Sequence, residues 1–282
     1  MTSAAVTETG FAKINLALHV RRRRADGYHD IETLFAFCAD GDGLSATPAD
    51  TLSLTIEGPF AEGLSAGPDN LVLRAAEALR AEAAIADGAA IRLVKRLPVA
   101  SGIGGGSADA AAALRLLVCL WGLTIAPERL HAIAAGLGAD VPACLVSRAC
   151  RGDGRGDALA MLDDGGLAEL PVLLVNPLVA VSTGPVFAGW DRIDRGALVE
   201  GDPLAVALAG RNDLEGPARM IAPVIGDVVA ALEACAGVTL ARMSGSGATC
   251  FALFADVTAR DTADAQIAAA HPGWWRLATS LR

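Results

Sequence analysis

A glycine-rich segment between two apolar runs is the strongest candidate for binding chemistry. It reads Ser101-Gly102-Ile103-Gly104-Gly105-Gly106-Ser107 and joins an apolar run at 91–97 to an alanine-rich run at 108–120. Successive glycines can turn neighbouring backbone N–H groups to one side, and the start of a helix adds unpaired N–H donors and the positive end of a dipole. A flexible linker is the alternative, but linkers are rarely held between two apolar elements. The segment therefore predicts a site that binds phosphate without a basic side chain.

The spacing of this segment excludes three familiar phosphate-binding motifs. Dinucleotide folds need Gly-x-Gly-x-x-Gly or a final Ala, whereas the last position here is Ser107 or Asp109. A Walker A loop needs Gly-Lys-Ser/Thr, and neither of the two lysines, Lys13 and Lys95, follows a glycine. The protein-kinase motifs His-Arg-Asp and Asp-Phe-Gly do not occur. What remains is a Gly-Gly-Gly-Ser loop at the start of a helix.

Lys13 and Asp140 are candidates for acid–base chemistry. Lys13 lies on a predicted strand, and Asp140 lies close to the start of a helix that Pro142 suits. In phosphoryl transfer to an alcohol, a carboxylate can accept the hydroxyl proton while a lysine orients the hydroxyl and offsets the developing charge. A surface lysine and a helix-capping aspartate are the alternative.

The only tyrosine of the chain, Tyr28, is followed by His29 in a predicted hairpin turn. An aromatic plane beside a ring with two hydrogen-bonding nitrogens can stack on a nucleobase and read its edge. An ordinary hairpin turn explains the same residues equally well, so spacing alone leaves both interpretations open.

Composition limits the class of protein. A chain of 282 residues favours two domains, and a net charge of −9 argues against general nucleic-acid binding. The uncharged run at 170–190 contains Pro171, Pro177 and Pro185, which argue against a membrane span. The N-terminus lacks the order of charges of a signal peptide, which predicts a cytoplasmic protein. The six cysteines form no Cys-x-x-Cys pair and are expected to be reduced packing residues rather than a zinc site.

Hydrophobic periodicity predicts a mixture of strands and helices without strict alternation, hence an α+β fold in two domains. The predicted strands cover 11–20, 31–38, 52–56, 91–97, 172–175, 239–243, 250–254 and 274–278. The predicted helices cover 70–86, 108–120, 127–135, 223–235 and 261–270, with a further one beginning near Pro142. The strand at 11–20 is expected to be half-buried, because its apolar residues alternate with polar ones. The Gly/Asp-rich stretch at 151–157 is the predicted junction, which gives domains at 1–156 and 157–282.

Six short motifs, taken in order, resemble the GHMP kinase superfamily. They are Ala12–Leu16, Asp26–His29, Pro98–Ala112, Gly138–Pro142, Asn212–Glu215 and Ser244–Cys250. Gly-Gly-Gly-Ser marks the superfamily, whereas Asp-Gly-Tyr-His and Lys-Ile-Asn resemble its member in the non-mevalonate isoprenoid route. The resemblance implies a two-domain GHMP kinase fold with an interdomain active-site cleft. It also implies ATP-dependent phosphorylation of the 2-hydroxyl of the methylerythritol moiety of a cytidine diphosphate substrate, giving the 2-phosphate and ADP.

The same resemblance implies residue roles. Asp140 would be the base and Lys13 its partner. Tyr28 and His29 would hold the cytosine, with Phe187 on its other face. The implied substrate residues are Asn15, Tyr28, His29, Thr183 and Phe187. The implied ATP residues are Asn70, Lys95, Pro98, Ser101, Gly102, Ile103, Gly104, Gly105, Gly106, Ser107 and Ala108.

The resemblance further implies that Mg²⁺ bridges the ATP phosphates; Ser107 is the one protein contact suggested for the ion, and no residue is predicted as a dedicated metal ligand. The partners would be small molecules, with no nucleic acid and no membrane, and the protein would be a monomer or weak homodimer. One departure from the pattern is Val99-Ala100-Ser101, which replaces a more glycine-rich start of the loop, and Ala108 stands where a second serine is common. The extra Cβ atoms restrict the backbone, which predicts a slightly different phosphate pose or weaker nucleotide affinity.

Two rival functions remain open at this point. Another GHMP member, such as a homoserine or mevalonate kinase, would have no base to stack on Tyr28 and His29. A catalytically silent nucleotide-binding regulator with the same fold would have no need of Lys13 and Asp140.

Overall fold

The computed structural model describes residues 5–163 and 165–282, and its described residues fall into two compact units. Unit 1 takes residues up to Ala12 together with 40–99 and 104–147. Unit 2 takes residues 13–39, 100–103 and 148–282. Both units are discontinuous in sequence, because the long strands β1 (Val6–Arg23) and β2 (His29–Ala49) contribute residues to each. The predicted division into 1–156 and 157–282 stays a prediction.

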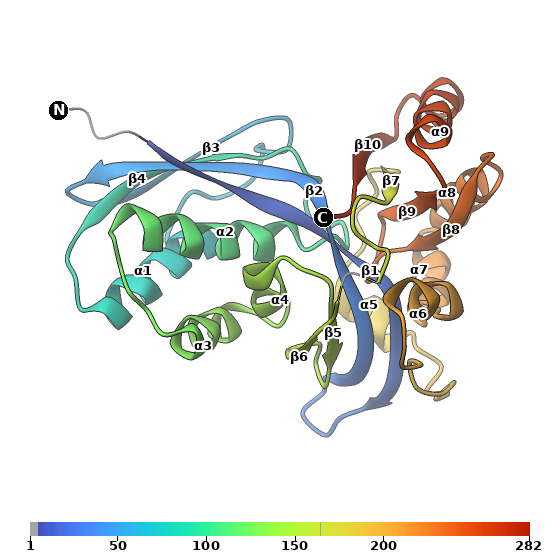
Figure 1. The fold of residues 1–282 in the computed structure, drawn as a ribbon, viewed down its shortest axis with the longest axis horizontal. Coiled ribbons are helices and arrows are strands. Elements are labelled where there is room, and N and C mark those ends of the chain that lie inside the picture. Colours follow the sequence, from blue (N-terminus) through green and yellow to red (C-terminus); the bar gives the residue numbers. More distant parts are fainter. Residues whose placement is uncertain (1–4, 164) are drawn as a thin grey trace. The chain divides into compact units, whose positions relative to one another are not determined.

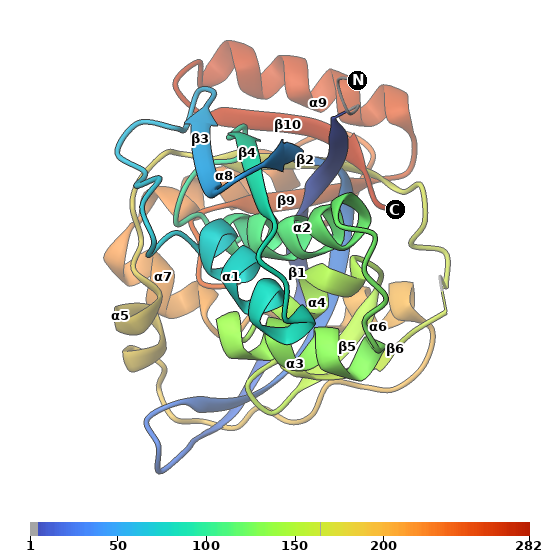
Figure 2. The same ribbon diagram turned by 90° about the vertical axis from the view of Figure 1, so that its left-hand side faces the viewer.

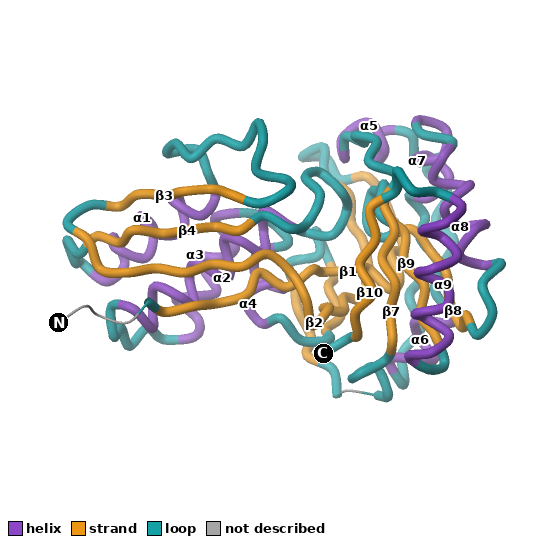
Figure 3. Tube along the Cα trace, turned by 90° about the horizontal axis from the view of Figure 1, so that it is seen from above, coloured by secondary structure: helices purple, strands orange, loops and turns teal. Residues whose placement is uncertain are grey.

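Unit 1 is a layer of strands with helices on one face (Figure 1). β3 (Leu52–Glu57) pairs in parallel with β4 (Gly88–Val94), and β4 pairs antiparallel with residues 43–49 of β2. The helices below this layer are α1 (Leu71–Ala83), α2 (Gly105–Leu120), α3 (Pro127–Leu137) and α4 (Val141–Val146). Seen from above, β3 and β4 lie across α1 and α2 (Figure 3). The core lies between these layers, where α1 and α2 bury alanine and leucine side chains against the strands.

Unit 2 contains an antiparallel four-stranded sheet in the order β10-β7-β9-β8. Its strands are β7 (Pro171–Asn176), β8 (Val238–Met243), β9 (Cys250–Phe254) and β10 (Trp275–Ser280). Helices α8 (Val224–Glu233) and α9 (Val257–Ala270) cover one face of this sheet, and α9 runs along β10 (Figures 2 and 3). The remaining elements of the unit are the hairpin strands β5 (Cys150–Asp153) and β6 (Ala158–Met161) and the short helices α5 (Thr183–Ala188), α6 (Pro203–Ala209) and α7 (Glu215–Ile221).

The predicted strand at 250–254 and the predicted helices at 127–135 and 223–235 are confirmed to within two residues at each end. One other expectation was wrong. The strand at 11–20 is not half-buried: every residue from Ala12 to Val20 is buried, because the polar side chains on its second face find hydrogen-bond partners. The stretch at 151–157, the predicted junction, forms strand structure: β5 and β6 pair there as a hairpin, and β5 also pairs with β2.

The limits of the elements around the glycine-rich segment also differ from the predicted ones. β4 ends at Val94 rather than at residue 97, and α2 begins at Gly105 rather than at residue 108. Five of the six cysteines are buried, and within the described residues all six are free thiols. Among the helices of the described chain, none has both the length and the apolar character needed to cross a membrane.

Candidate active site

The glycine-rich segment ends in the first turn of α2, a helix of 16 residues. Gly104 is its N-cap residue with φ 67°, and no side chain of the described residues caps this helix start. The first turn of a helix leaves its N–H groups without intrahelical acceptors, so Gly105, Gly106 and Ser107 present their amides at the positive end of the helix dipole. Gly106 is exposed. The start of α2 therefore has the donors that a phosphate needs.

The other residues predicted for the ATP phosphates differ in exposure. Pro98, Ser101, Ile103 and Ala108 are buried, so their contribution to a phosphate site would come from backbone atoms or packing. Ala100, in the stretch that departs from the family pattern, adopts φ 50°. This left-handed conformation costs an alanine roughly 1–2 kcal/mol. The effect of this stretch on the phosphate pose and on nucleotide affinity stays a prediction.

A second Gly/Ser loop, Ser244–Gly247, packs against Gly102 inside unit 2. A Cβ atom added to Gly102 would lie 2.5 Å from the Ser244 carbonyl oxygen and 2.8 Å from that of Gly247. The Ser244 hydroxyl donates to the Gly102 carbonyl at 2.9 Å and accepts from the Asn15 N–H at 3.1 Å. From sequence this loop carried only a weak signal, because Gly/Ser loops often merely turn the chain. The structure gives it a role as the support of Gly102.

Lys13 and Asn15 lie together on β1. The Lys13 ammonium donates to Asn15 Oδ1 at 2.9 Å and lies 5.0 Å from the centre of the Phe35 ring, while only 3% of the residue is exposed. Asn15 Nδ2 donates to Thr33 Oγ1 at 2.8 Å, and Thr33 in turn donates to the Ala17 carbonyl. The amide of Asn15 is thereby fixed, and it directs the lysine ammonium.

Asp140 occupies the N-cap position of α4, as predicted, yet it does not cap that helix. Its backbone φ and ψ are −84° and −15°, and among the described residues no side-chain capping bond forms at this helix. The residue is half-buried. The structural alternative of a capping aspartate therefore loses its support. Lys13 belongs to unit 2 and Asp140 to unit 1, and their pairing remains a prediction.

Three of the predicted substrate residues gather around the hairpin between β1 and β2. The His29 ring lies 5.0 Å from the Phe187 ring and 5.8 Å edge-on from Trp190. Burial lowers the pKa of His29, and the nearby Arg23 lowers it further, so the neutral ring with one donor and one acceptor is favoured. Tyr28 is 56% exposed, with the Arg155 guanidinium 5.3 Å from its ring centre. Thr183 Oγ1 lies 3.0 Å from Ser246 Oγ, in the second Gly/Ser loop.

The spacing of these rings limits how a base could bind. A planar base between two parallel rings needs about 7 Å between their centres, and His29 and Phe187 are closer than that. A cytosine would therefore stack on the exposed Tyr28 or on a free ring face, with His29 at its edge.

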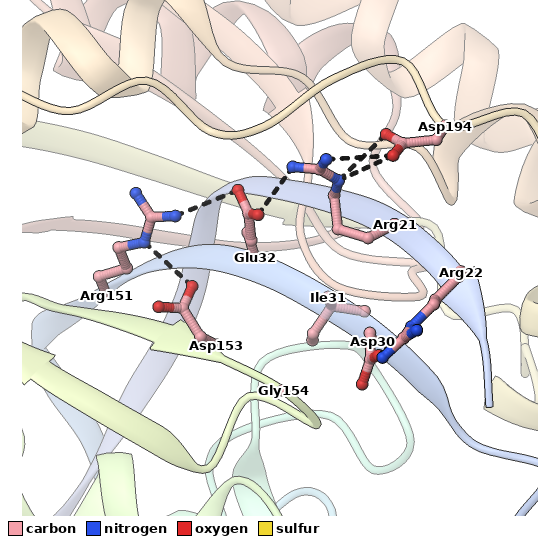
Figure 4. A pocket seen from close by; sticks show the side chains of 9 residues that line it. All are labelled: Arg21, Arg22, Asp30, Ile31, Glu32, Arg151, Asp153, Gly154 and Asp194. Atoms are coloured by element: carbon pink, nitrogen blue, oxygen red, sulfur yellow. Dashed lines mark hydrogen bonds and ion pairs between the residues drawn. The ribbon is translucent and has the colours of Figure 1, made fainter.

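A network of ion pairs fastens the irregular segment 189–202 to this hairpin (Figure 4). Glu32 accepts from Arg21 at 2.7 Å, from Arg151 at 3.1 Å and from the Leu198 N–H at 2.6 Å. Arg21 also pairs with Asp194 at 3.0 Å. The network lines an open cavity of about 380 Å³, but its arginines are matched by carboxylates, so the cavity is not an anion site. It positions the segment that follows the Phe187 helix. No local pattern predicts this network, because its members Glu32 and Asp194 lie 162 positions apart.

The side chains of Asn70 and Lys95 form hydrogen bonds and ion pairs with other residues of unit 1. Asn70 caps α1 by accepting from the Val72 N–H at 2.9 Å, and it donates to the Ser65 carbonyl at 2.8 Å. The Lys95 ammonium is 3% exposed and donates to carboxylates of Asp42 and Asp109. Contact of either residue with ATP stays a prediction.

Comparison with known proteins places the chain in a family. The family model described as GHMP kinases N terminal domain matches residues 70–148, and the one described as GHMP kinases C terminal matches 195–273. A relative from Rhizorhabdus wittichii, named 4-diphosphocytidyl-2-C-methyl-D-erythritol kinase, is 60% identical over 98% of this chain and 94% of its own length. A relative of the same name from Sphingopyxis alaskensis is 55% identical over 99% of this chain and 100% of its own.

Solved structures agree with this grouping. A crystal structure of 4-(cytidine 5'-diphospho)-2C-methyl-D-erythritol kinase is similar with a TM-score of 0.79, at 33% identity over 98% of both chains. The homoserine kinase from Cytophaga hutchinsonii shares the fold with a TM-score of 0.75 over 99% of this chain and 95% of its own, but at 18% identity. The chain has the two-domain α+β fold of a GHMP kinase, and it belongs to the 4-diphosphocytidyl-2-C-methyl-D-erythritol kinase family.

Proposed function

We propose that this chain transfers the terminal phosphoryl group of ATP to the 2-hydroxyl of 4-diphosphocytidyl-2-C-methyl-D-erythritol, giving the 2-phosphate and ADP. The chain is a small-molecule kinase, and this reaction places it in non-mevalonate isoprenoid precursor biosynthesis. The observation that carries the proposal is the 60% identity, over nearly the whole chain, to a relative named for this substrate. The intact Gly-Gly-Gly-Ser segment at the start of α2 supports the use of ATP.

The start of α2 is the proposed seat of the ATP phosphates. Its uncapped amides and dipole fit an anion, and the exposed Gly106 lets phosphate oxygens approach the backbone closely. Mg²⁺ bound to the phosphates would supply charge neutralisation in the reaction. Within the described residues no group of three or more His, Cys, Asp or Glu side chains gathers as a metal site.

Asp140 and Lys13 are the proposed catalytic residues. Asp140 accepts the proton of the 2-hydroxyl, while the Lys13 ammonium, directed by Asn15, offsets the negative charge that develops on the hydroxyl oxygen. Phosphoryl transfer depends mainly on positioning and electrostatics, so the position of the Asp140 carboxylate matters more than its strength as a base.

The hairpin between β1 and β2 is the proposed cytosine site. Tyr28 supplies an exposed ring for stacking, and neutral His29 supplies one hydrogen-bond donor and one acceptor for the edge of the base. Phe187 packs against His29 and limits how the ring can turn. Asn15 and Thr183 are proposed to contact the remainder of the substrate.

We also propose that the protein works in the cytoplasm as a monomer or weak homodimer, without nucleic-acid or membrane partners. A net charge of −9 disfavours nucleic acid and anionic lipid surfaces alike. ATP is available in the cytoplasm.

The experiment that tests the proposed function is ATP turnover with a panel of alcohols. We expect 4-diphosphocytidyl-2-C-methyl-D-erythritol to exceed homoserine and mevalonate in kcat/KM by about 10⁴-fold, because a site built to pair with a base leaves polar groups unsatisfied when the base is missing. ADP release with a coupled assay gives the rate, and phosphorus NMR identifies the product. Equal turnover of the three alcohols, or none, would retire the assignment.

Replacing Tyr28 with Ala should weaken substrate binding while leaving the chemistry intact. Stacking on one base contributes about 1–3 kcal/mol, so KM for the cytidine diphosphate substrate should rise roughly 5- to 150-fold. The kcat and the KM for ATP should change little. Tyr28→Phe is the matched control, since it keeps the ring, and it should retain the original KM. An unchanged KM in Tyr28→Ala would remove this residue from the base site.

A further inference from the structure

A buried cluster of three charged side chains lies beside the glycine-rich segment. Asp42 comes from β2, Lys95 follows β4, and Asp109 lies on α2, with side chains 0%, 3% and 6% exposed. The Lys95 ammonium donates to Asp109 Oδ2 at 2.7 Å and to Asp42 Oδ2. All three residues belong to unit 1. The chemistry proposed above gives neither carboxylate any part.

Asp42 shapes the turn that leads into the glycine-rich segment. Its Oδ1 accepts the backbone N–H groups of Arg96 and of Leu97, the latter at 2.9 Å. Because these amides bond to a carboxylate rather than to a neighbouring strand, β4 ends at Val94. The turn at 95–97 is thus tied to Asp42 through two amides and the lysine ammonium.

Lys95 and Asp109 make the contacts at the start of α2, on the far side of the glycine-rich segment. A Cβ atom added to Gly105 would lie 3.1 Å from Lys95 Nζ, so the ammonium packs directly against the first helical residue. Asp109 lies four positions further along, on the same face of the helix. One ammonium therefore links the turn before the segment to the helix after it.

The cluster is poorly arranged for stability alone. Burial raises the pKa of Asp109 to about 7, which the Lys95 ammonium opposes and the Asp42 carboxylate reinforces. Asp109 Oδ1 is buried and, among the described residues, has no hydrogen-bond partner. This oxygen lies against Gly10, because a Cβ atom added to Gly10 would be 3.0 Å from Asp109 Oδ1. Buried ion clusters of this kind are often less stable than apolar packing of equal volume, so a role in geometry accounts for them better.

We propose that Asp109 is a positioning residue for ATP, acting through Lys95 and Asp42 to fix the start of α2 relative to the turn at 95–97. This inference rests on the proposed function, since it assumes that the amides of Gly105, Gly106 and Ser107 bind the ATP phosphates. Those amides are effective only when their directions are fixed before ATP binds.

Asp109→Ala is the variant that tests this role. It leaves Lys95 paired with Asp42, so no unbalanced charge stays buried and the fold should be retained. Calorimetry should give a Kd for ATP about tenfold higher than that of the unmodified chain, because the start of α2 loses its ion pair with Lys95. The KM for the cytidine diphosphate substrate should stay within about twofold. Asp109→Asn keeps an oxygen that can accept from Lys95, and it should restore the Kd to within about threefold.

Glu82→Gln is the control, because it removes an exposed ion pair with Arg129 in the same unit. Its Kd for ATP and its melting temperature should match those of the unmodified chain. If Asp109→Ala bound ATP as tightly as the unmodified chain, or only melted earlier at unchanged affinity, the inference would be overturned. If the unmodified chain itself failed to bind ATP, the proposed function would be overturned together with it.

Discussion

Replacing Asp140 with Asn should lower kcat by about 10²- to 10⁴-fold, the usual loss when one acid–base group is removed. Asparagine has almost the same shape but cannot accept the hydroxyl proton. Initial rates at saturating ATP and substrate give kcat, and calorimetry with ATP should show a Kd within about threefold of the original. A larger fall in kcat than in ATP affinity is the expected signature of a group that acts only in the transition state.

The control for this prediction is another aspartate at a helix start. Asp202 is the N-cap residue of α6, and its carboxylate accepts from the Ala205 N–H at 3.0 Å. Asp202→Ala should therefore cost about 1 kcal/mol of stability and leave kcat unchanged. Asp140→Ala should lower kcat without the stability loss of a missing cap, because the Asp140 carboxylate does not cap α4. If Asp140→Asn kept full turnover, or if both Ala variants lost only stability, Asp140 would have no part in the reaction.

Local sequence signals predicted most of the secondary structure and the motif residues, but not what those residues contact. The strand at 250–254 is a run of apolar and β-forming residues, and its limits were predicted correctly. The start of α2 was missed because glycine is a poor helix former, and only the surrounding structure allows three N-terminal residues to be Gly-Gly-Ser. Helices α5, α6 and α7 were missed because six or seven residues are too few to show a helical period.

Long-range contacts explain the other differences. The second face of β1 is buried because Asn15 bonds to Thr33 and Ser244, which are 18 and 229 positions away. Asp42 lies in an Asp-Gly-Asp stretch that looks like a turn, and nothing local indicates that it binds Lys95, 53 positions further on. Residue types thus predicted which side chains could do chemistry, whereas their partners depended on the tertiary structure.

Gly102→Ala should destabilise the protein more than any other single change in the glycine-rich segment. Gly102 has φ 77°, a conformation that costs a residue with a Cβ about 1–2 kcal/mol. The new Cβ would also lie within 2.8 Å of two backbone oxygens, those of Ser244 and Gly247, which cannot move as a flexible side chain could. Together these effects should lower the free energy of unfolding by about 3 kcal/mol or more. Thermal melts should show a fall of roughly 6–12 °C.

Gly106→Ala is the matching test at a glycine that is proposed to face ATP, whereas Gly102 has a structural role. Beyond its own helix and its chain neighbours, an added Cβ there would meet only Leu71 Cδ1 among the described residues, at an ordinary 3.6 Å, so the fold has room for it. Because alanine is a better helix former, stability should rise by up to about 1 kcal/mol, while ATP affinity should fall since the methyl group obstructs phosphate oxygens. In Gly106→Ala the melting temperature should therefore rise while the affinity for ATP falls, so that Tm and Kd both increase. If this variant bound ATP normally, or if Gly102→Ala melted like the unmodified chain, then the two glycines would not differ as their surroundings predict.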